Sequence, residues 1–443
     1  MTDRPWREYT WSSMPDEDRA RILTRSNHKV FDPELLRSVG EILEDVRANG
    51  DAACSRALAR FDGCDVPPDR LRVSEAEIAA APGQVPEPVR EAIRYGIESL
   101  RRFHARQTRE REWEEEIRPG LVVGEKLTPV TRAAVFVPSG KASYPSVMMQ
   151  LGTPAVVAGV PEIAVIVPPA PGGAGEVDPA VLFAASELGI TEIHRANGPA
   201  GIAAAAFGTE SVRPVRMIVG PGSPAVTAAQ ILVQTHGVVT NMLLGPSESL
   251  VIADDGADPE FIASDILNEA EHGPDSASLL VTPSRALADA LVAIVERRLA
   301  DLPEPRRSYA RSSLTGYGGV ILVDDLAQAA EVANAHAPEH MVVDVRDPDA
   351  LLPLLVNAGE ILVGPWTPIS AANFAVGVPA ALPTGGFAKV SSAITAHTFL
   401  KATSIARASR DALADMAGCV LPLCDHEGFP GHAASYRSRG VGG

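Results

Sequence analysis

Three short segments carry residue types that can bind a metal ion or move a proton. The first is "EAEHGPD", in which Glu269 and His272 are three residues apart near the end of an expected helix. At about 100 degrees per residue, both side chains follow the helix face that holds Ile262 and Ile266. A carboxylate and an imidazole on one inward face can share a metal ion. A solvated helix end, with His near the C-terminal dipole, is an equally good interpretation.

The second segment is "HAPEHMVV", where Pro338 ends a helix and leaves Glu339 and His340 in the turn that enters the strand "MVVDV". Loops at sheet ends often carry function. A carboxylate beside an imidazole can act as a general base pair near neutral pH. Glu339 and His340 are therefore candidate catalytic residues.

The third segment, "CDHEGFPGH" at 424–432, lies close to the end of the chain, and three interpretations of it stay open. A structural zinc site would use these residues: Cys419, Cys424, His426 and His432. Only one residue separates Cys424 from His426, however, which hardly closes a tetrahedral cage. A solvated tail is the second interpretation. In the third, Glu427 and His432 complete the site begun by the first segment.

The elements that must position these residues follow an α/β pattern. Residues 32–100 have the apolar spacing of helices, with Gly50 placed as a C-cap, and from residue 133 onward short apolar runs alternate with helical stretches. Two such series, before and after residue 245, predict two Rossmann-like, doubly wound parallel sheets. The stretch "AHTFLKATSIARASRDALADMAG" at 396–418 predicts one or two amphipathic helices.

These patterns divide the chain into four expected parts. They are an N-terminal arm (1–30), a discontinuous first α/β domain (31–132 and 246–395), a second Rossmann-like domain (133–245) and a C-terminal tail (396–443). Sheets of this kind bind ligands in a crevice at the carboxyl ends of their strands.

One possible phosphate loop is "GPGSPA", from Gly220 to Ala225, which fits G-x-G-x-x-A between a strand and a helix. Pro221 and Pro224 each remove a backbone N–H that could bind phosphate. A tight strand-to-helix turn is therefore the favoured interpretation.

Composition excludes several classes of function. The 443 residues carry a net charge of -17, which repels a nucleic-acid backbone. The four cysteines are too few for a disulfide framework, and "MTDRPWREYTW" has no apolar leader. Apolar runs are broken by Gly, Pro and Glu before they could span a membrane. We expect a cytoplasmic protein with no nucleic-acid or membrane partner.

Five motifs, in order and spacing, resemble the histidinol dehydrogenase family: "GPSESLVIAD", "EAEHGPDS", "HAPEH", "GEILVGPWTP" and "LPTGG". The resemblance runs from about residue 30 to His432. It implies an NAD-dependent homodimer with one zinc ion per subunit, which oxidises a primary alcohol through an aldehyde to a carboxylate in two hydride transfers. It also implies that each C-terminal tail is exchanged onto the partner subunit.

The resemblance assigns roles residue by residue. Glu339 would activate the water that attacks the aldehyde, and His340 would take the alcohol proton. The substrate contacts would be Ser247, His340, Asn373 and Glu427. The zinc ligands would be Glu269, His272, Asn373 and His432, where the family has Gln, His, Asp and His. The exchange at 269 adds one negative charge and the exchange at 373 removes one, so the ligand set keeps its net charge.

Other positions bear on specificity. The His that the family uses on the imidazole of its substrate falls at Ala380, and its NAD contacts Tyr, Gln and Asn fall at Phe136, Ala200 and Ser223. Lys141 could supply a cation for NAD, and helix N-termini attract its phosphates. Three hypotheses follow: a dehydrogenase of a small polar primary alcohol other than histidinol, a genuine histidinol dehydrogenase, or a metal- or ligand-binding paralogue without redox activity.

Overall fold

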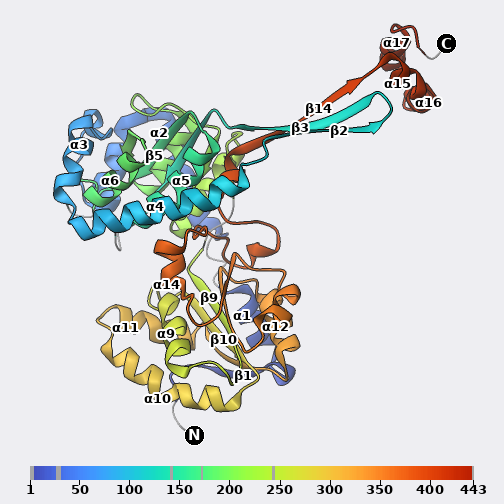
Figure 1. Cartoon of the computed structure of the whole chain (residues 1–443). Coiled ribbons are helices and arrows are strands. Elements are labelled where there is room, and N and C mark those ends of the chain that lie inside the picture. The colour runs from blue at the N-terminus through green and yellow to red at the C-terminus, as the bar shows by residue number, and fades with distance from the viewer. Residues whose placement is uncertain (1–3, 26–30, 140–142, 171–172, 242–244, 442–443) are drawn as a thin grey trace.

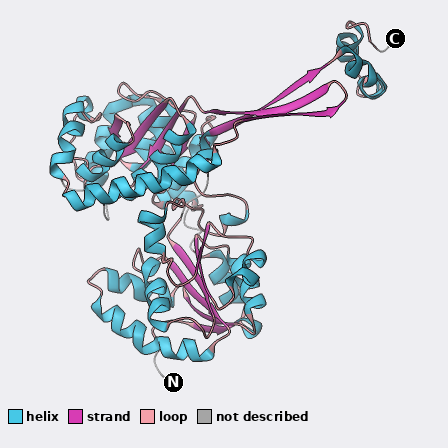
Figure 2. Ribbon diagram, in the orientation of Figure 1, coloured by secondary structure: helices cyan, strands magenta, loops and turns pink. Residues whose placement is uncertain are grey.

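The computed structural model describes residues 4–25, 31–139, 143–170, 173–241 and 245–441. The chain forms two α/β lobes, one above the other in Figure 1, and a long arm that leaves the upper lobe. Each lobe is built around a parallel sheet that helices flank, as Figure 2 shows by secondary structure. The α/β class with parallel sheets, predicted from the sequence, is thus what the chain adopts.

The upper lobe contains a five-stranded parallel sheet in the order β6-β5-β4-β7-β8. Its strands are β4 (Arg132–Phe136), β5 (Glu162–Val167), β6 (Glu192–Arg195), β7 (Met217–Val219) and β8 (Val239–Thr240). Its helices are α2 (Pro33–Ala57), α3 (Glu75–Gln84), α4 (Glu87–Gln107), α5 (Pro145–Ala158), α6 (Pro179–Glu187), α7 (Gly198–Phe207) and α8 (Pro224–Gln234). Successive side chains of β4 enter opposite cores, Val135 into one and Phe136 into the other, so both faces of the sheet are covered.

The division of the first 132 residues differs from our prediction. We expected residues 31–132 to join residues 246–395, but α2, α3 and α4 pack on the five-stranded sheet. Ile93 and Leu100 of α4, for example, share a core with Val135. Periodicity shows which face of a helix is apolar, but it does not show which sheet that face covers.

The lower lobe contains a six-stranded parallel sheet in the order β1-β11-β10-β9-β12-β13. Its strands are β1 (Glu8–Thr10), β9 (Glu248–Ala253), β10 (Ala277–Thr282), β11 (Gly319–Leu322), β12 (His340–Asp344) and β13 (Glu360–Val363). Its helices are α1 (Asp16–Thr24), α9 (Pro259–Ala270), α10 (Arg285–Asp301), α11 (Arg306–Thr315), α12 (Leu326–His336), α13 (Pro348–Leu351) and α14 (Ile369–Ala371). The segment expected to be an N-terminal arm is instead part of this lobe, because β1 pairs with β11.

Short helical turns connect the longer elements. They are the 3-10 turns Trp11–Ser13, Pro68–Arg70, Leu352–Leu354, Phe387–Lys389 and Ala396–Phe399, and the π turns Leu58–Asp62 and Ala372–Val376. The second π turn, η6, follows α14 directly and carries Asn373. Gly50, at φ 52°, interrupts the helical backbone of α2 at the position where we expected a C-cap.

The arm is an antiparallel sheet of β2 (Glu112–Arg118), β3 (Leu121–Pro129) and β14 (Leu400–Ala408), in the order β14-β3-β2. Three helices follow β14 at its tip: α15 (Arg410–Asp415), α16 (Ala417–His426) and α17 (Pro430–Arg437). The helical prediction for residues 396–418 was therefore wrong for 400–408. Pairing of that whole segment with β3 overrides a local pattern that also suits a helix.

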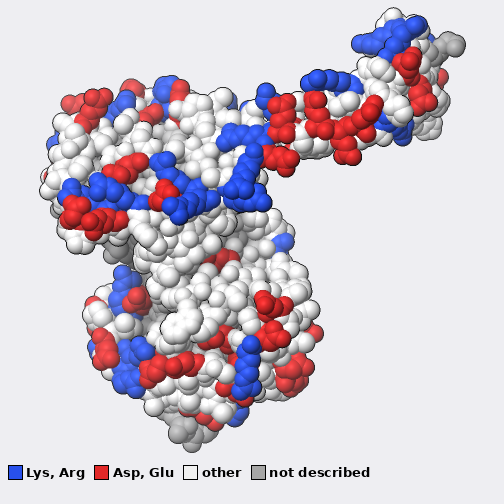
Figure 3. Space-filling model, in the orientation of Figure 1, with Lys and Arg blue, Asp and Glu red and all other residues white. Residues whose placement is uncertain are grey.

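Charge is unevenly spread over the molecule. Acidic side chains of β2 follow the arm, and basic side chains gather on α4 and at the base of the arm (Figure 3). No helix among the described residues has the length and apolar character to cross a bilayer.

Candidate active site

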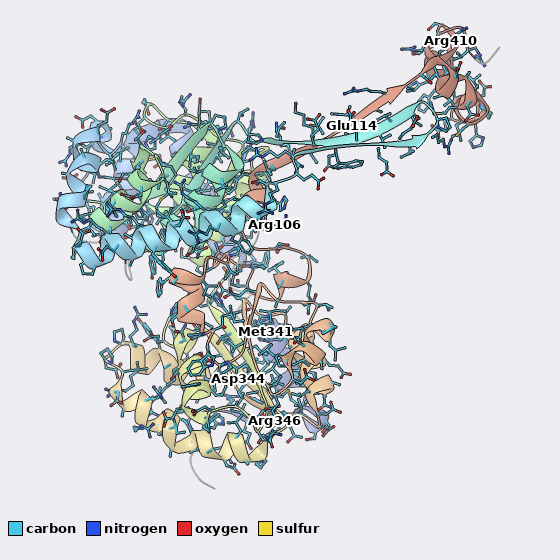
Figure 4. All side chains as sticks on the ribbon, viewed as in Figure 1. Arg106, Glu114, Met341, Asp344, Arg346 and Arg410 are labelled. Atoms are coloured by element: carbon cyan, nitrogen blue, oxygen red, sulfur yellow. The ribbon has the colours of Figure 1, made fainter. Side chains whose placement is uncertain are left out.

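The predicted catalytic pair lies at the amino end of β12. Helix α12 ends at His336, and Ala337 adopts a left-handed conformation, with φ 52°, that turns the chain into Pro338 and the strand. Glu339 and His340 are both buried there. We expected ligands to bind at the carboxyl ends of the strands. In this lobe that prediction was wrong, because the pair lies at the amino end of its strand. In Figure 4, Met341 lies nearer to the upper lobe than Asp344, so this end of β12 faces the junction of the lobes.

Two carboxylates flank the imidazole of His340. Its Nδ1 lies 2.5 Å from Oε1 of Glu360, and its Nε2 lies 3.8 Å from Oε1 of Glu339. Burial alone would lower the pKa of His340, but the charges of Glu339, Glu360 and Glu269 raise that pKa to about 9. His340 is therefore a strong base that binds a proton readily.

Glu339 is held by the start of β9. Its Oε2 accepts the backbone N–H of Glu248 at 3.0 Å. Burial raises the pKa of Glu339 to about 8, and the nearby negative charge of Glu269 adds to the rise. A carboxyl with such a pKa can accept a proton from water once the pH is above about 8, where it is ionised.

Behind this pair, Glu248 forms a buried ion pair with Arg25, with 3.0 Å between Oε1 and Nε. Oε1 of Glu248 also accepts the backbone N–H of Gly385, at 2.8 Å. Arg25 donates further to the backbone carbonyl of His336, at 2.7 Å. The end of α1, the start of β9 and the end of α12 are thus joined beneath Glu339.

The sequence analysis did not identify Glu248, Arg25 or Glu360. One feature of the sequence could have identified Glu248: it is a charged residue at the start of a strand that is mostly apolar. No sequence feature could have identified Arg25 or Glu360, because only the folded chain brings residues 25, 248, 340 and 360 together.

The first candidate metal-binding pair is close in space. Glu269 is 1% exposed, and its Oε2 lies 3.3 Å from Nδ1 of His272. Oγ of Ser247 lies 3.1 Å from the same nitrogen, and Asn268 donates to Oε1 of Glu269 at 2.8 Å. Two ligands of one tetrahedral zinc ion, each about 2.0–2.2 Å from it, are about 3.4 Å apart. The pair therefore fits a shared zinc ion, with Ser247 beside it.

Asn373, the third predicted ligand, lies in η6 at the junction of the lobes. Its backbone carbonyl accepts from Nε2 of Gln150 in α5 at 3.4 Å, and Oε1 of Gln150 accepts the N–H of Ala380 at 2.9 Å. Helix α5 of the upper lobe thus fixes the segment that carries Asn373 and Ala380.

Glu427 and His432 lie elsewhere. Both are exposed on the helices at the tip of the arm, which Figure 1 shows well away from the two lobes. Among the described residues, no three His, Cys, Asp or Glu side chains gather closely enough to hold a metal ion. One chain therefore brings together Ser247, Glu269 and His272, but it does not bring His432 or Glu427 to them.

A cavity of about 620 Å³ opens in the upper lobe at the carboxyl ends of β4 to β7, where we expected a ligand crevice. Phe136 and Ser223, two of the predicted NAD contacts, line it, together with Asn197 and Asp62. Nδ2 of Asn197 donates to Oδ2 of Asp62 at 2.8 Å, and burial raises the pKa of Asp62.

The other two predicted NAD contacts are not on the wall of this cavity. Ala200 is a residue of α7 and is fully buried in the core of the upper lobe, and Lys141 lies outside the described residues. A Cβ at Gly220 would come within 2.2 Å of the carbonyl oxygen of Phe136. That glycine is therefore required for close packing of the turn on β4, which supports the tight-turn interpretation of "GPGSPA".

Arg306, the first residue of α11, acts on groups of both lobes. Phe136 and Ser139 line the cavity, and Tyr144 starts α5 close enough for the charge of Arg306 to act on its phenol. Arg306 donates at 3.1 Å to the carbonyl of Glu271, next to His272. Arg306 thus links the start of α5 in the upper lobe to the end of α9 in the lower lobe.

Comparison with known proteins gives consistent matches over the whole chain. A family model described as histidinol dehydrogenase matches residues 25–440. A "Histidinol dehydrogenase homolog" of Rhizobium meliloti is 40% identical over 427 residues, which is 96% of this chain and 92% of the relative. The "Histidinol dehydrogenase" of Synechocystis is 40% identical over 92% of this chain and 93% of its own length.

A solved structure is also similar. The crystal structure of histidinol dehydrogenase from Elizabethkingia anophelis superposes with a TM-score of 0.93 at 29% identity, covering 99% of both chains.

Proposed function

The chain belongs to the histidinol dehydrogenase family, and we propose that it is an NAD- and zinc-dependent dehydrogenase of a small polar primary alcohol other than histidinol. The product would be a carboxylate, formed through an aldehyde. The observation that carries the proposal is the buried Glu339–His340 pair at the junction of the lobes. Two bases of raised pKa, side by side, suit two successive proton removals.

The candidate metal ligands are Glu269, His272 and Asn373 of one chain and His432 of a second copy. When bound, zinc would supply Lewis acidity and NAD would supply the hydride acceptor. Ser247 would bind the substrate beside His272.

The residues of the chain would move the protons. In the first oxidation, which gives the aldehyde, Nε2 of His340 would take the hydroxyl proton, and bound NAD would be the acceptor of the hydride from the C–H bond. In the second, Glu339 takes a proton from the water that attacks the aldehyde carbonyl. The resulting hydrate anion would give up a second hydride to NAD and form the carboxylic acid, which releases its proton and becomes the carboxylate. Burial of Glu339 and His340 keeps bulk water from competing for these protons.

The proposal that the substrate is not histidinol rests on Ala380. A methyl side chain cannot donate to or accept from an imidazole. The backbone N–H of Ala380 is also engaged by Gln150, at 2.9 Å.

A second candidate function is genuine histidinol oxidation. The observation that favours it is the 40% identity to the Synechocystis protein named "Histidinol dehydrogenase". That identity differs little from the identity to the relatives named homologs.

A direct assay separates these candidates. Zinc-loaded protein is mixed with NAD and with L-histidinol or one of a panel of amino alcohols, diols and sulfonated alcohols, and NADH is counted per alcohol consumed. We expect two NADH per molecule of an alcohol other than histidinol. Turnover of histidinol alone would favour the second candidate, and no NADH with any alcohol would contradict both.

The proposed oligomer is a homodimer with exchanged C-terminal tails. Its support is the exposure of Glu427 and His432 at the tip of an arm that carries them away from Ser247, Glu269 and His272. A second copy could bring the two missing residues to the site.

A further inference from the structure

The carboxylate of Glu360 has no evident structural task. Its side chain is only 7% exposed, and among the described residues the carboxylate's one hydrogen-bond and ion-pair partner is Nδ1 of His340, at 2.5 Å. Its other oxygen, Oε2, is buried without a hydrogen-bond partner among those residues. Burying a carboxylate in this way costs free energy, and this cost points to a role for its contact with the imidazole.

Strand register creates this contact. His340 and Glu360 are paired residues at the amino ends of the parallel neighbours β12 and β13. Paired residues of adjacent strands point to the same face of a sheet. The carboxylate of Glu360 meets Nδ1 of the ring, whereas Nε2 lies 3.8 Å from Oε1 of Glu339.

We propose that Glu360 is a positioning residue, whose carboxylate accepts the Nδ1 proton of His340 and leaves Nε2 as the atom that takes the alcohol proton. The inference rests on the proposed dehydrogenase function. A neutral imidazole carries one ring proton, and the partner of one nitrogen decides which nitrogen carries it. With the Nδ1 proton committed to Glu360, the lone pair of Nε2 faces the side on which Glu339 lies.

Glu360 also stabilises the state that follows proton transfer. Once Nε2 has taken the alcohol proton, the ring is a cation and the carboxylate balances its charge. The other charged groups that face the ring are Glu339 on its own strand, Glu248 at the start of β9 and Glu269 on α9. Of these three and Glu360, only Glu360 is hydrogen-bonded to the ring.

The first test measures His340 without using turnover. The ring is titrated by NMR in the full-length protein, labelled at histidine, and its signal is assigned by its absence from His340→Gln. We expect Glu360→Gln to lower the pKa of His340 by at least about one unit, because the amide keeps the shape of the side chain and removes its charge. Glu360→Asp should restore part of the shift. An unchanged pKa in Glu360→Gln would overturn the proposal.

The second test uses the pH profile of alcohol oxidation. In Glu360→Gln the acid limb of kcat should move to lower pH, and kcat at its optimum should fall about tenfold or more with KM little changed. Asp344→Asn is the matched control, because it removes a buried carboxylate from the far end of β12. An equal fall in Asp344→Asn, or an unmoved acid limb in Glu360→Gln, would contradict the proposal.

The two tests separate this inference from the proposed function. If the wild-type protein oxidised no alcohol, the dehydrogenase proposal would fail, but the NMR titration would still decide whether Glu360 controls the protonation of His340.

Discussion

Glu339 and His340 are adjacent in the sequence, but the structure gives their side chains different partners. Glu339 is held by a backbone N–H of β9, and His340 is held by a side chain of β13. The two residues can therefore act in different steps, one on water and the other on the alcohol. This division leads to a prediction for each of them.

Replacement of Glu339 by Gln should stop the second oxidation while the first continues, because an amide cannot take a proton from water. Oxidation of added aldehyde should slow by about 10²- to 10⁴-fold, and NADH per alcohol should fall from two to one as the aldehyde accumulates. A trapping reagent and NADH absorbance measure both quantities. Glu271→Gln is the control and should leave both quantities unchanged, because two residues along a helix turn the side chain to nearly the opposite face from Glu269. If Glu339→Gln oxidised the aldehyde at the wild-type rate, the proposed role of Glu339 as the base that acts on water would be wrong.

Glu339 and His340 should also determine how kcat/KM depends on pH. Both residues act as bases, so each must lack its proton, and their pKa values are raised to about 8 for Glu339 and about 9 for His340. Activity should therefore be lost as pH falls through this range, in macroscopic steps that belong to the pair. A bound zinc ion would move the loss toward lower pH, because a nearby cation favours the ionised carboxylate and the neutral imidazole. A flat profile between about pH 5 and 9 would exclude these residues as the bases.

Much of the candidate site could be predicted from the sequence, because its paired residues are close neighbours along the chain. Glu269 and His272 lie one helical turn apart, and Glu339 and His340 enter a strand together, so each pair is close whatever the tertiary fold. Glu360 is brought to His340 by strand register, and Arg25 is brought to Glu248 by the packing of α1. Local patterns carry no information about either contact.

At the scale of elements, one buried ion pair ties the N-terminal helix to the catalytic strands. Arg25 and Glu248 have side chains 2% and 4% exposed, and the backbone N–H of Glu248 holds Glu339. Loss of Arg25 would leave a buried carboxylate without its countercharge. The consequences should reach both stability and the placement of Glu339.

The variant Arg25→Met should be less stable than the wild type by about 3–5 kcal/mol. Burial already raises the pKa of Glu248, and without Arg25 that pKa should rise further. When the pKa of a carboxyl is higher in the folded protein than its unfolded value of about 4.3, the folded protein loses stability as the pH rises above that value. The deficit should therefore be larger at pH 8 than at pH 5, as measured by denaturant unfolding.

The matched control is Arg4→Met, which breaks a pair with Asp289 that is partly exposed. Such pairs contribute about 1 kcal/mol or less. A deficit of Arg25→Met that is no larger than that of Arg4→Met would show that the buried pair does not stabilise the fold.

Elements also show where sequence patterns stop being informative. The alternation of short apolar runs and helical stretches predicts parallel sheets, because strands buried on both faces are apolar throughout. It does not predict the arm, since β2 is exposed along its whole length and β14 has a pattern that also suits a helix. Antiparallel pairing over the whole of β14 makes it a strand, and such pairing depends on residues about 280 positions away.

At the scale of the whole molecule, the arm separates residues that the resemblance places in one site. Its three strands extend from the upper lobe, and α15 to α17 pack together at its tip (Figure 1). An acidic strand, β2, lies along this arm, and basic side chains gather at its base (Figure 3). An extended arm with a folded tip, rather than a tail packed on its own lobes, suits exchange between two copies of the chain.

Mixed dimers test this exchange. A heterodimer of Glu339→Gln and His432→Asn subunits, purified through two different tags, should recover about half of the wild-type rate of aldehyde oxidation, the step that Glu339→Gln blocks, if each tail completes the partner's site. One of its sites then holds both defects, and the other holds neither. If each tail closed over its own subunit, every site would hold one defect and the heterodimer would oxidise aldehyde as slowly as the two homodimers. A heterodimer of Glu339→Gln with wild-type subunits is the control, because it has one intact site under either arrangement. Half activity in this control and none in the mixed dimer would contradict tail exchange, and equal activities would support it.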